Sequence, residues 1–462
     1  MPAAGTEAGP GEKSGGRAVL SGLTTRGRSF LAAGLAAAGC AYVLGQGDLL
    51  RVGLLLAVLP LMCVLVLYRT RYRVAGSRSL TPARVPAGSE ARVNLRMDNV
   101  SRLPTGLLML QDRVPYVLGP RPRFILDKVE AGGRREVSYR VRSDLRGRYP
   151  LGPLQLRLTD PFGMCELSRS FSAYDTLTVI PRVVALPPVR LSGEANGYGD
   201  GRLRSLALAG EDDIIPRGYR HGDDLRRVHW RSTARYGELM VRREEQPQRA
   251  RCTVLLDTRR DAYAGAGPDS AFEWAVSGAA SALVHMLERG FSVRLLTDTG
   301  TSVPGDGGGG FTGSTQEAAD SAGLMMDTLA VVGHSGGGGL SPAYDVLRGG
   351  NEGLLIAFFG DLDDAQAAVA ARMRQRSGGA VAFVADSALW TAEQAPAEAV
   401  REQAEERLRL LRGAGWTAVP VGPGASLPDL WRQAEAQRNG GADTGSTKTG
   451  TSGMSGISGG WS

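Results

Sequence analysis

The sequence predicts a multidomain protein: a two-helix transmembrane hairpin, then a β-sandwich domain, then a doubly wound α/β domain. Three observations predict this order. Two uncharged apolar runs lie near the N-terminus, segments of alternating apolar and polar residues follow them, and short apolar strands then alternate with amphipathic helices. A chain of 462 residues is also too long for a single ordinary core, so several folded units are expected.

The two apolar runs cover residues 29–46 and 52–68, and neither contains a charged residue. Each is just long enough to cross a bilayer. A cleaved signal peptide is disfavoured because the second run follows almost at once, and a buried core hairpin because both runs are apolar on every side. The runs therefore predict a transmembrane hairpin.

The charges around the hairpin predict its orientation. The loop between the two runs is nearly neutral, whereas basic residues lie outside the hairpin at both ends, namely Arg26, Arg28, Arg69, Arg71 and Arg73. Because basic flanks stay in the cytoplasm, both termini and both soluble domains are expected on the cytoplasmic side of the cell membrane. The glycine-rich segments 1–28 and 439–462 predict a disordered head and a disordered tail.

Residues 74–185 show the alternation that is typical of β-strands. Apolar and polar residues alternate in segments 91–97, 137–141 and 154–158, and glycine and proline separate such segments. In a strand, this spacing places all the apolar side chains on one face. The region therefore predicts an antiparallel β-sandwich of immunoglobulin-like size.

After residue 250 the pattern changes to strand followed by helix. A short buried strand is expected at residues 253–257, and an amphipathic helix at 269–290 ends at Gly290. Further strands are expected at 292–298, 354–360, 380–385 and 417–421. Residues 251–438 therefore predict the doubly wound α/β domain, and residues 186–250 connect it to the β-sandwich.

Composition excludes several classes of function. The chain has a net charge of +7 and a sequence pI near 9.4, which favours an anionic lipid surface as a partner. No zinc-finger, recognition-helix or aromatic RNA-binding pattern occurs, so no nucleic-acid partner is expected. The run most similar to a phosphate-binding loop, at residues 11–14, lies in the head, which argues against nucleotide hydrolysis.

The cysteines do not form a recognisable framework. They are widely separated, without the short paired spacing of a zinc or redox site, at Cys40, Cys63, Cys165 and Cys252. We therefore expect no disulfides, no resident metal and no cofactor, as suits a reducing compartment.

The segment 215–245 is dense in arginine, carboxylate and aromatic residues. Asp223 predicts the start of a capped helix, and residues 239–241 predict a strand. The segment could bind an anion. The favoured alternative is an interdomain clamp, in which Asp223 and Glu245 pair with arginines and Trp230 fills the seam between the domains.

Two further patterns occur in order along the chain. The first, Arg-Gly-x-Tyr, Gly-Pro and Asp-Pro-Phe-Gly, occurs at residues 146–149, 152–153 and 160–163. The second, Arg-x-Tyr-x-x-Gly-Asp followed by Arg, Trp and Ala-Arg, occurs at Arg217, Tyr219, Gly222, Asp223, Arg227, Trp230, Ala234 and Arg235. Both patterns resemble those of the bacterial domain of unknown function 58 family. Two patterns in the right order, spread over most of the chain after the hairpin, make the resemblance specific.

The resemblance implies a fold and partners. The C-terminal domain of the family is similar to a von Willebrand factor A domain, and its members are associated with MoxR-type AAA+ ATPases and transglutaminase-like membrane proteins. The implied role is that of a membrane-anchored adaptor or assembly factor. Such a factor would work with a MoxR-type ATPase at the cytoplasmic face without being an enzyme.

A metal-binding von Willebrand factor A domain uses Asp-x-Ser-x-Ser after its first strand, because hard oxygen ligands suit magnesium. Here Asp257 keeps the first position, but Arg259 and Asp261 replace both serines. Asp361 stands where a later acidic ligand is expected. The arginine brings a positive charge to the cation position, so we expect a degenerate, metal-free site.

The loops at residues 257–261, 298–300 and 361–364 are expected to form a docking face for a partner, because parallel strands direct their carboxyl ends to one edge. The alternative function is a hydrolase or other enzyme that uses the segment from Arg217 to Arg235. His221 and His229 lie in that segment, but the sequence shows no complete catalytic set.

Overall fold

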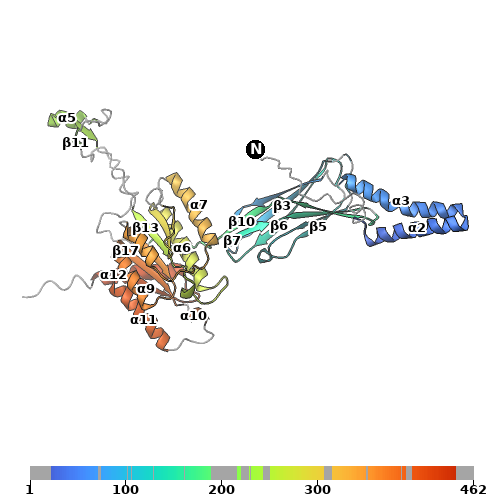
Figure 1. The fold of residues 1–462 in the computed structure, drawn as a ribbon. Coiled ribbons are helices and arrows are strands. Elements are labelled where there is room, and N and C mark those ends of the chain that lie inside the picture. Colours follow the sequence, from blue (N-terminus) through green and yellow to red (C-terminus); the bar gives the residue numbers. More distant parts are fainter. Residues whose placement is uncertain are drawn as a thin grey trace, which may run out of the picture. The chain divides into compact units, whose positions relative to one another are not determined.

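The structure, a computed structural model, describes residues 22–70, 74–188, 216–219, 228–242, 250–305, 315–386, 388–391 and 398–443, apart from single residues 101, 103, 106, 128, 161, 229, 350, 351 and 387. The chain divides into two compact units, Met1–Ile180 and Pro181–Ser462 (Figure 1). Each unit has its own apolar core.

Two apolar helices begin the first unit, α2 (Thr25–Leu44) and α3 (Gly47–Thr70), and they run side by side in Figure 1. By length and composition, Thr25–Leu44 and Gly47–Leu67 can each cross a membrane. The helix α3 extends beyond the predicted run 52–68 at both ends, whereas α2 begins before the predicted run 29–46 and ends two residues before its predicted end. The expected loop at residues 47–51 is instead the first turn of α3, where Asp48 favours the helix N-terminus and accepts a bond from Arg51 (3.1 Å).

Small residues bring the two helix backbones into contact. A Cβ atom at Gly34 would lie 2.6 Å from the Ala57 nitrogen, and one at Gly53 would lie 2.7 Å from the Ala38 nitrogen. Small residues permit such close approach between apolar helices. A larger side chain at either glycine would push the helices apart.

The remaining described part of the first unit is mainly β-structure, with a short 3-10 helix at Tyr116–Leu118. Its sheets have the orders β1-β3-β6, β5-β4-β8-β9 and β2-β10-β7. The strands are β1 (Val74–Thr81), β2 (Arg84–Pro86), β3 (Glu90–Asn99), β4 (Leu107–Asp112), β5 (Arg123–Leu126), β6 (Arg134–Arg142), β7 (Gly147–Leu151), β8 (Leu154–Thr159), β9 (Glu166–Phe171) and β10 (Asp175–Ile180). Neighbouring strands are antiparallel except β2 and β10.

The predicted alternation is confirmed in β3, where buried and more exposed residues follow each other along the strand. Val93 and Leu95 are fully buried there, and residues from all three sheets join one apolar cluster. Leu23, Val64 and Leu67, at the base of the helical hairpin, belong to the same cluster. The hairpin is therefore packed onto the β-structure.

The second unit contains a six-stranded sheet of order β15-β14-β13-β16-β17-β18. Its strands are β13 (Arg251–Leu256), β14 (Ser292–Thr297), β15 (Ser302–Val303), β16 (Glu352–Phe359), β17 (Ser377–Ala385) and β18 (Thr417–Val421). All pairs are parallel except β14 with β15, so the sheet is mixed. The prediction of residues 417–421 as a strand is confirmed without a shift.

Helices cover both faces of this sheet. They are α6 (Ala271–Glu288), α7 (Thr315–Val331), α8 (Ser341–Arg348), α9 (Asp364–Arg374), α10 (Ala388–Thr391), α11 (Glu398–Gly413) and α12 (Leu427–Asp443). One apolar cluster contains buried residues of α6, α7 and α12, and another contains those of α8, α9 and α11. The edge of the sheet at which β13, β14 and β16 end lies between these two helix layers.

Candidate functional site

Three of the parallel strands deliver an aspartate to the same edge of the six-stranded sheet. Asp257 follows β13, Asp298 follows β14, and Asp361 lies two residues after β16. These strands are neighbours, in the order β14-β13-β16. Asp257 and Asp298 are fully buried, whereas Asp361 is half-buried.

Arg259 closes this edge by pairing with Asp257. Its Nε donates to Asp257 Oδ1 at 2.9 Å and its Nη2 donates to Asp257 Oδ2 at 2.7 Å, so the pair is bidentate. The side chain of Arg259 is only 8% exposed. Main-chain N–H groups of Arg259 and Gly360 also donate to the carboxylate, at 3.1 and 3.3 Å. Both oxygens of Asp257 are therefore engaged.

Arg259 also connects β13 to the loop after β16, because its Nη2 donates to the main-chain carbonyl of Asp361 at 3.1 Å. The sequence predicted that Asp257 and Asp361 belong to one site, and the structure brings them to the same guanidinium. Asp361 accepts this bond from Arg259 through its main-chain carbonyl oxygen.

Asp298 forms a second buried network. Its Oδ1 accepts from the main-chain nitrogen of Thr258 (2.8 Å) and from the Thr258 hydroxyl, and its Oδ2 accepts from the Ser335 hydroxyl (2.6 Å). The Ser335 nitrogen in turn donates to the Thr258 carbonyl at 2.7 Å. Sequence reasoning missed Ser335, and its only signal was the run of glycines that follows it.

The pKa shifts describe a charged pair held in a buried place. Burial raises the pKa of the Asp257 carboxyl, while the hydrogen bonds and charge of Arg259 act against that rise. Burial by itself would lower the pKa of Arg259, but the hydrogen bond and charge of Asp257 outweigh it and raise that pKa. Arg259 therefore remains a guanidinium and supplies the positive charge at this edge.

The hydrogen bonds of Asp257 and Asp298 fix the loops at this edge relative to one another. Within the described ranges, no three His, Cys, Asp or Glu side chains are grouped so that they could hold a metal ion. In the loops at this edge, exposed carboxylates include Asp261, Asp363 and Asp364. Asp363 also caps α9, since its Oδ1 accepts from the Gln366 nitrogen at 2.7 Å.

The segment 215–245, which we call the signature segment, is described by the structure only in part. Its strands β11 (Pro216–Gly218) and β12 (Met240–Arg242) pair, with Arg217 opposite Val241, and a helix α5 (Trp230–Tyr236) lies between them. Trp230 is 72% exposed, and Ala234 and Arg235 are also exposed, whereas Tyr219 is half-buried. Gly222, Asp223 and Arg227 lie outside the described residues, as does the predicted helix start, so the clamp stays a prediction.

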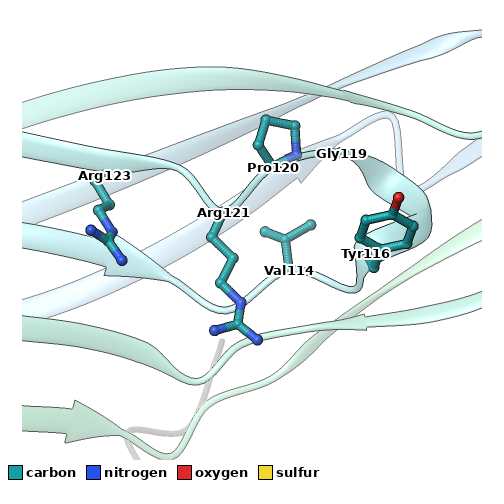
Figure 2. Close-up of a pocket in the computed structure, with 6 residues that line it drawn as sticks. All are labelled: Val114, Tyr116, Gly119, Pro120, Arg121 and Arg123. Atoms are coloured by element: carbon teal, nitrogen blue, oxygen red, sulfur yellow. The ribbon is translucent and has the colours of Figure 1, made fainter.

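A hollow of about 640 Å³ in the β-structure was not foreseen. It is lined by Val114, Tyr116, Gly119, Pro120, Arg121 and Arg123, which Figure 2 shows around the connection from β4 to β5. The two guanidinium groups suit an anion, and the Tyr116 phenol is the other polar side chain among these lining residues.

Two solved structures to which this chain is similar are weak likenesses. A CARDB domain of Pyrococcus furiosus is 10% identical, covers 23% of this chain and 86% of its own, and has a TM-score of 0.18. The alkylpurine DNA glycosylase AlkC of Pseudomonas fluorescens is 16% identical, covers 27% of this chain and 38% of its own, and has a TM-score of 0.16. Scores this low carry no argument.

Sequence comparison is more informative. The uncharacterized protein YeaD of Bacillus subtilis (strain 168) is 26% identical over 281 residues, which is 57% of this chain. The match spans 66% of that protein, just under two thirds of its length. The range 216–310 contains the signature segment, the Asp257–Arg259 pair and Asp298, and over this range the chain matches the family described as protein of unknown function DUF58.

Proposed function

We propose that this protein is a membrane-anchored, non-enzymatic adaptor or assembly factor that works with a MoxR-type AAA+ ATPase at the cytoplasmic face of the cell membrane. In this proposal the β-structure is an immunoglobulin-like sandwich and the second unit is a von Willebrand factor A-like domain. A transglutaminase-like membrane protein is a second partner. These assignments rest on the family resemblance of residues 146–163 and 217–235.

The observation that supports the proposal is that the buried aspartates at the carboxyl ends of β13 and β14 are already bonded within the protein. Parallel sheets receive ligands at this edge. Here Asp257 is already bound by Arg259, and Asp298 by Thr258 and Ser335, so neither carboxylate is available to a metal or a substrate. What the edge offers to a partner is exposed negative charge on loops that a rigid network holds in place.

The exposed charges that best test docking are Asp261 and Asp364. Asp363 caps α9 and Asp361 is half-buried beside Arg259, so changes at these two positions would disturb the fold as well as the surface. The charges of Asp261 and Asp364 can be reversed without removing the cap of α9 or the hydrogen bonds of Asp257 and Asp298. Glu402, an exposed carboxylate on α11, provides a control of the same charge.

The experiment is crosslinking and recovery of the protein from membranes. The double variant Asp261→Arg/Asp364→Arg should retain the ATPase roughly tenfold less well, because charge complementarity governs association. Glu402→Arg should retain it as the parent does. Equal retention by all variants, or no ATPase among the crosslinked partners, would overturn the docking proposal and favour the alternative enzyme in the Arg217–Arg235 segment.

A further inference from the structure

A tight turn between Asp160 and Gly163, in which the Gly163 nitrogen donates to the Asp160 carbonyl at 3.0 Å, presents the side chain of Phe162 at one end of the β-structure. Asp160 is 6% exposed, and its carboxylate accepts from the Phe162 nitrogen at 3.1 Å and from the Cys165 nitrogen at 2.6 Å. Gly163 has a φ of +68°, which favours glycine there. Phe162 is 61% exposed. A buried carboxylate therefore fixes a turn whose apolar side chain points outward.

This turn is attached to both helices of the hairpin. The Thr24 hydroxyl donates to the Gly163 carbonyl at 2.8 Å, and the Thr24 nitrogen donates to the Met164 carbonyl at 2.9 Å. On the other helix, Cys165 Sγ contacts the carbonyl of Pro60 at 3.6 Å. The turn is therefore held beside both helices. On α3 it lies at the level of Pro60, well before the end of that helix at Thr70.

The length of the hairpin places this turn near lipid. Leu59, Cys63, Val64 and Leu67 of α3 pack against the apolar cluster of the β-structure. Residues 47–58, which lie beyond that packing, rise only about 18 Å at 1.5 Å per residue. The hydrocarbon layer of a bilayer is about 30 Å thick. A hairpin that crosses the bilayer therefore brings the end of the β-structure down to the lipid headgroups.

The side chains at this end suit a headgroup region. Arg26 and Arg28 are exposed in the first turn of α2, and the Arg26 Nη1 atom lies 3.7 Å from the position a Cβ atom would take at Gly163. Phe30, one turn further along α2, is 38% exposed. Arginine beside phenylalanine is the pairing by which protein surfaces bind anionic phosphates and the acyl boundary together.

We infer that the turn at residues 160–163 enters the bilayer interface, with Phe162 at the acyl boundary and Arg26 at the lipid phosphates. This inference rests on the membrane anchor of the proposed function. It assigns a role to the Asp-Pro-Phe-Gly pattern: the turn sets how close the β-structure sits to the membrane.

The test places the photoreactive residue benzoylphenylalanine at single positions of the full chain in vesicles of phosphatidylglycerol and phosphatidylcholine. Position 162 is compared with position 35, an exposed site in the middle of α2, and with position 116. Tyr116 is 95% exposed in the connection after β4, at the opposite end of β8 from Asp160, so it is a matched aromatic control.

After illumination, covalent lipid adducts are expected at positions 35 and 162 and not at position 116. Adducts at position 35 alone would overturn the inference while leaving the anchor intact, as would adducts at all three positions. An absence of adducts at position 35 would overturn the anchor itself.

Discussion

Replacing Arg259 by methionine keeps an unbranched apolar stem and removes the guanidinium group with its charge. The carboxylate of Asp257, which is fully buried, would lose the two guanidinium bonds of 2.9 and 2.7 Å and keep only main-chain donors. Removing one partner of a buried ion pair typically costs about 3–5 kcal/mol. Coulomb attraction at 4 Å and an effective dielectric of 20 gives about 4 kcal/mol, which agrees.

For a unit of this size, about 1 kcal/mol corresponds to roughly 2–4 °C in Tm, so Arg259→Met should lower the Tm of the α/β unit by about 6–20 °C. Differential scanning calorimetry of the purified full chain measures the shift, and hydrogen exchange of β13 and β16 amides locates it. Arg260→Met is the matched control, since Arg260 is the exposed neighbour.

The double variant Asp257→Leu/Arg259→Met should recover much of the lost stability, because replacing a whole buried pair by apolar residues is often neutral. If Arg259→Met melted within about 2 °C of the parent, the ion pair would not be what holds this edge together. The reasoning from its geometry would then be refuted.

Three further predictions follow from described residues. Magnesium and manganese should not bind the chain with useful affinity in calorimetry, because Arg259 occupies the Asp257 carboxylate; saturable binding that Asp257→Ala abolishes would contradict this. Burial, and then the charge of Arg289, lowers the pKa of His285. The unfolded chain therefore binds the extra proton first, and stability should fall as the pH drops below about 6.5, less so in His285→Phe; identical pH profiles for the two would argue against it. Gly53→Leu should separate α2 from α3 and lower the yield of folded protein from detergent, whereas Gly39→Leu, where a Cβ meets nothing within 4 Å, should not; equal yields would show that the contact is dispensable.

Local patterns predicted much of the fold because the physics that sets it is local. Alternation along residues 91–97 predicted β3 and its buried face, and the apolar run at 417–421 predicted β18. The helix boundaries were less accurate. Arg26 was interpreted as a flank and Asp48 as part of the loop between the runs, but both lie in the first turn of a helix. Thr24 caps α2, and the negative charge of Asp48 suits the N-terminal dipole of α3.

The candidate site was predictable in its residue types and not in its geometry. Arg259 at the position of a metal ligand indicated that an arginine supplies the positive charge there. Its bidentate contact with Asp257 depends on how the loop after β13 folds back, which the sequence pattern does not give. Ser335 reaches Asp298 across 37 positions of sequence through a glycine-rich loop, and no periodicity records that distance. For the signature segment, exposure of Trp230 is new information, while Asp223 and Arg227 lie outside what is described.

The close contact of α2 with α3 has a mechanical consequence. Because Gly34 and Gly53 let the two backbones approach closely, neither helix can slide along the other without first moving apart from it. The hairpin base is in turn joined to the β-structure at Thr24 and Pro60, on separate helices. A force on the first unit is therefore divided between these two attachments. The hairpin restrains the orientation of the β-structure more strongly than a single helix would.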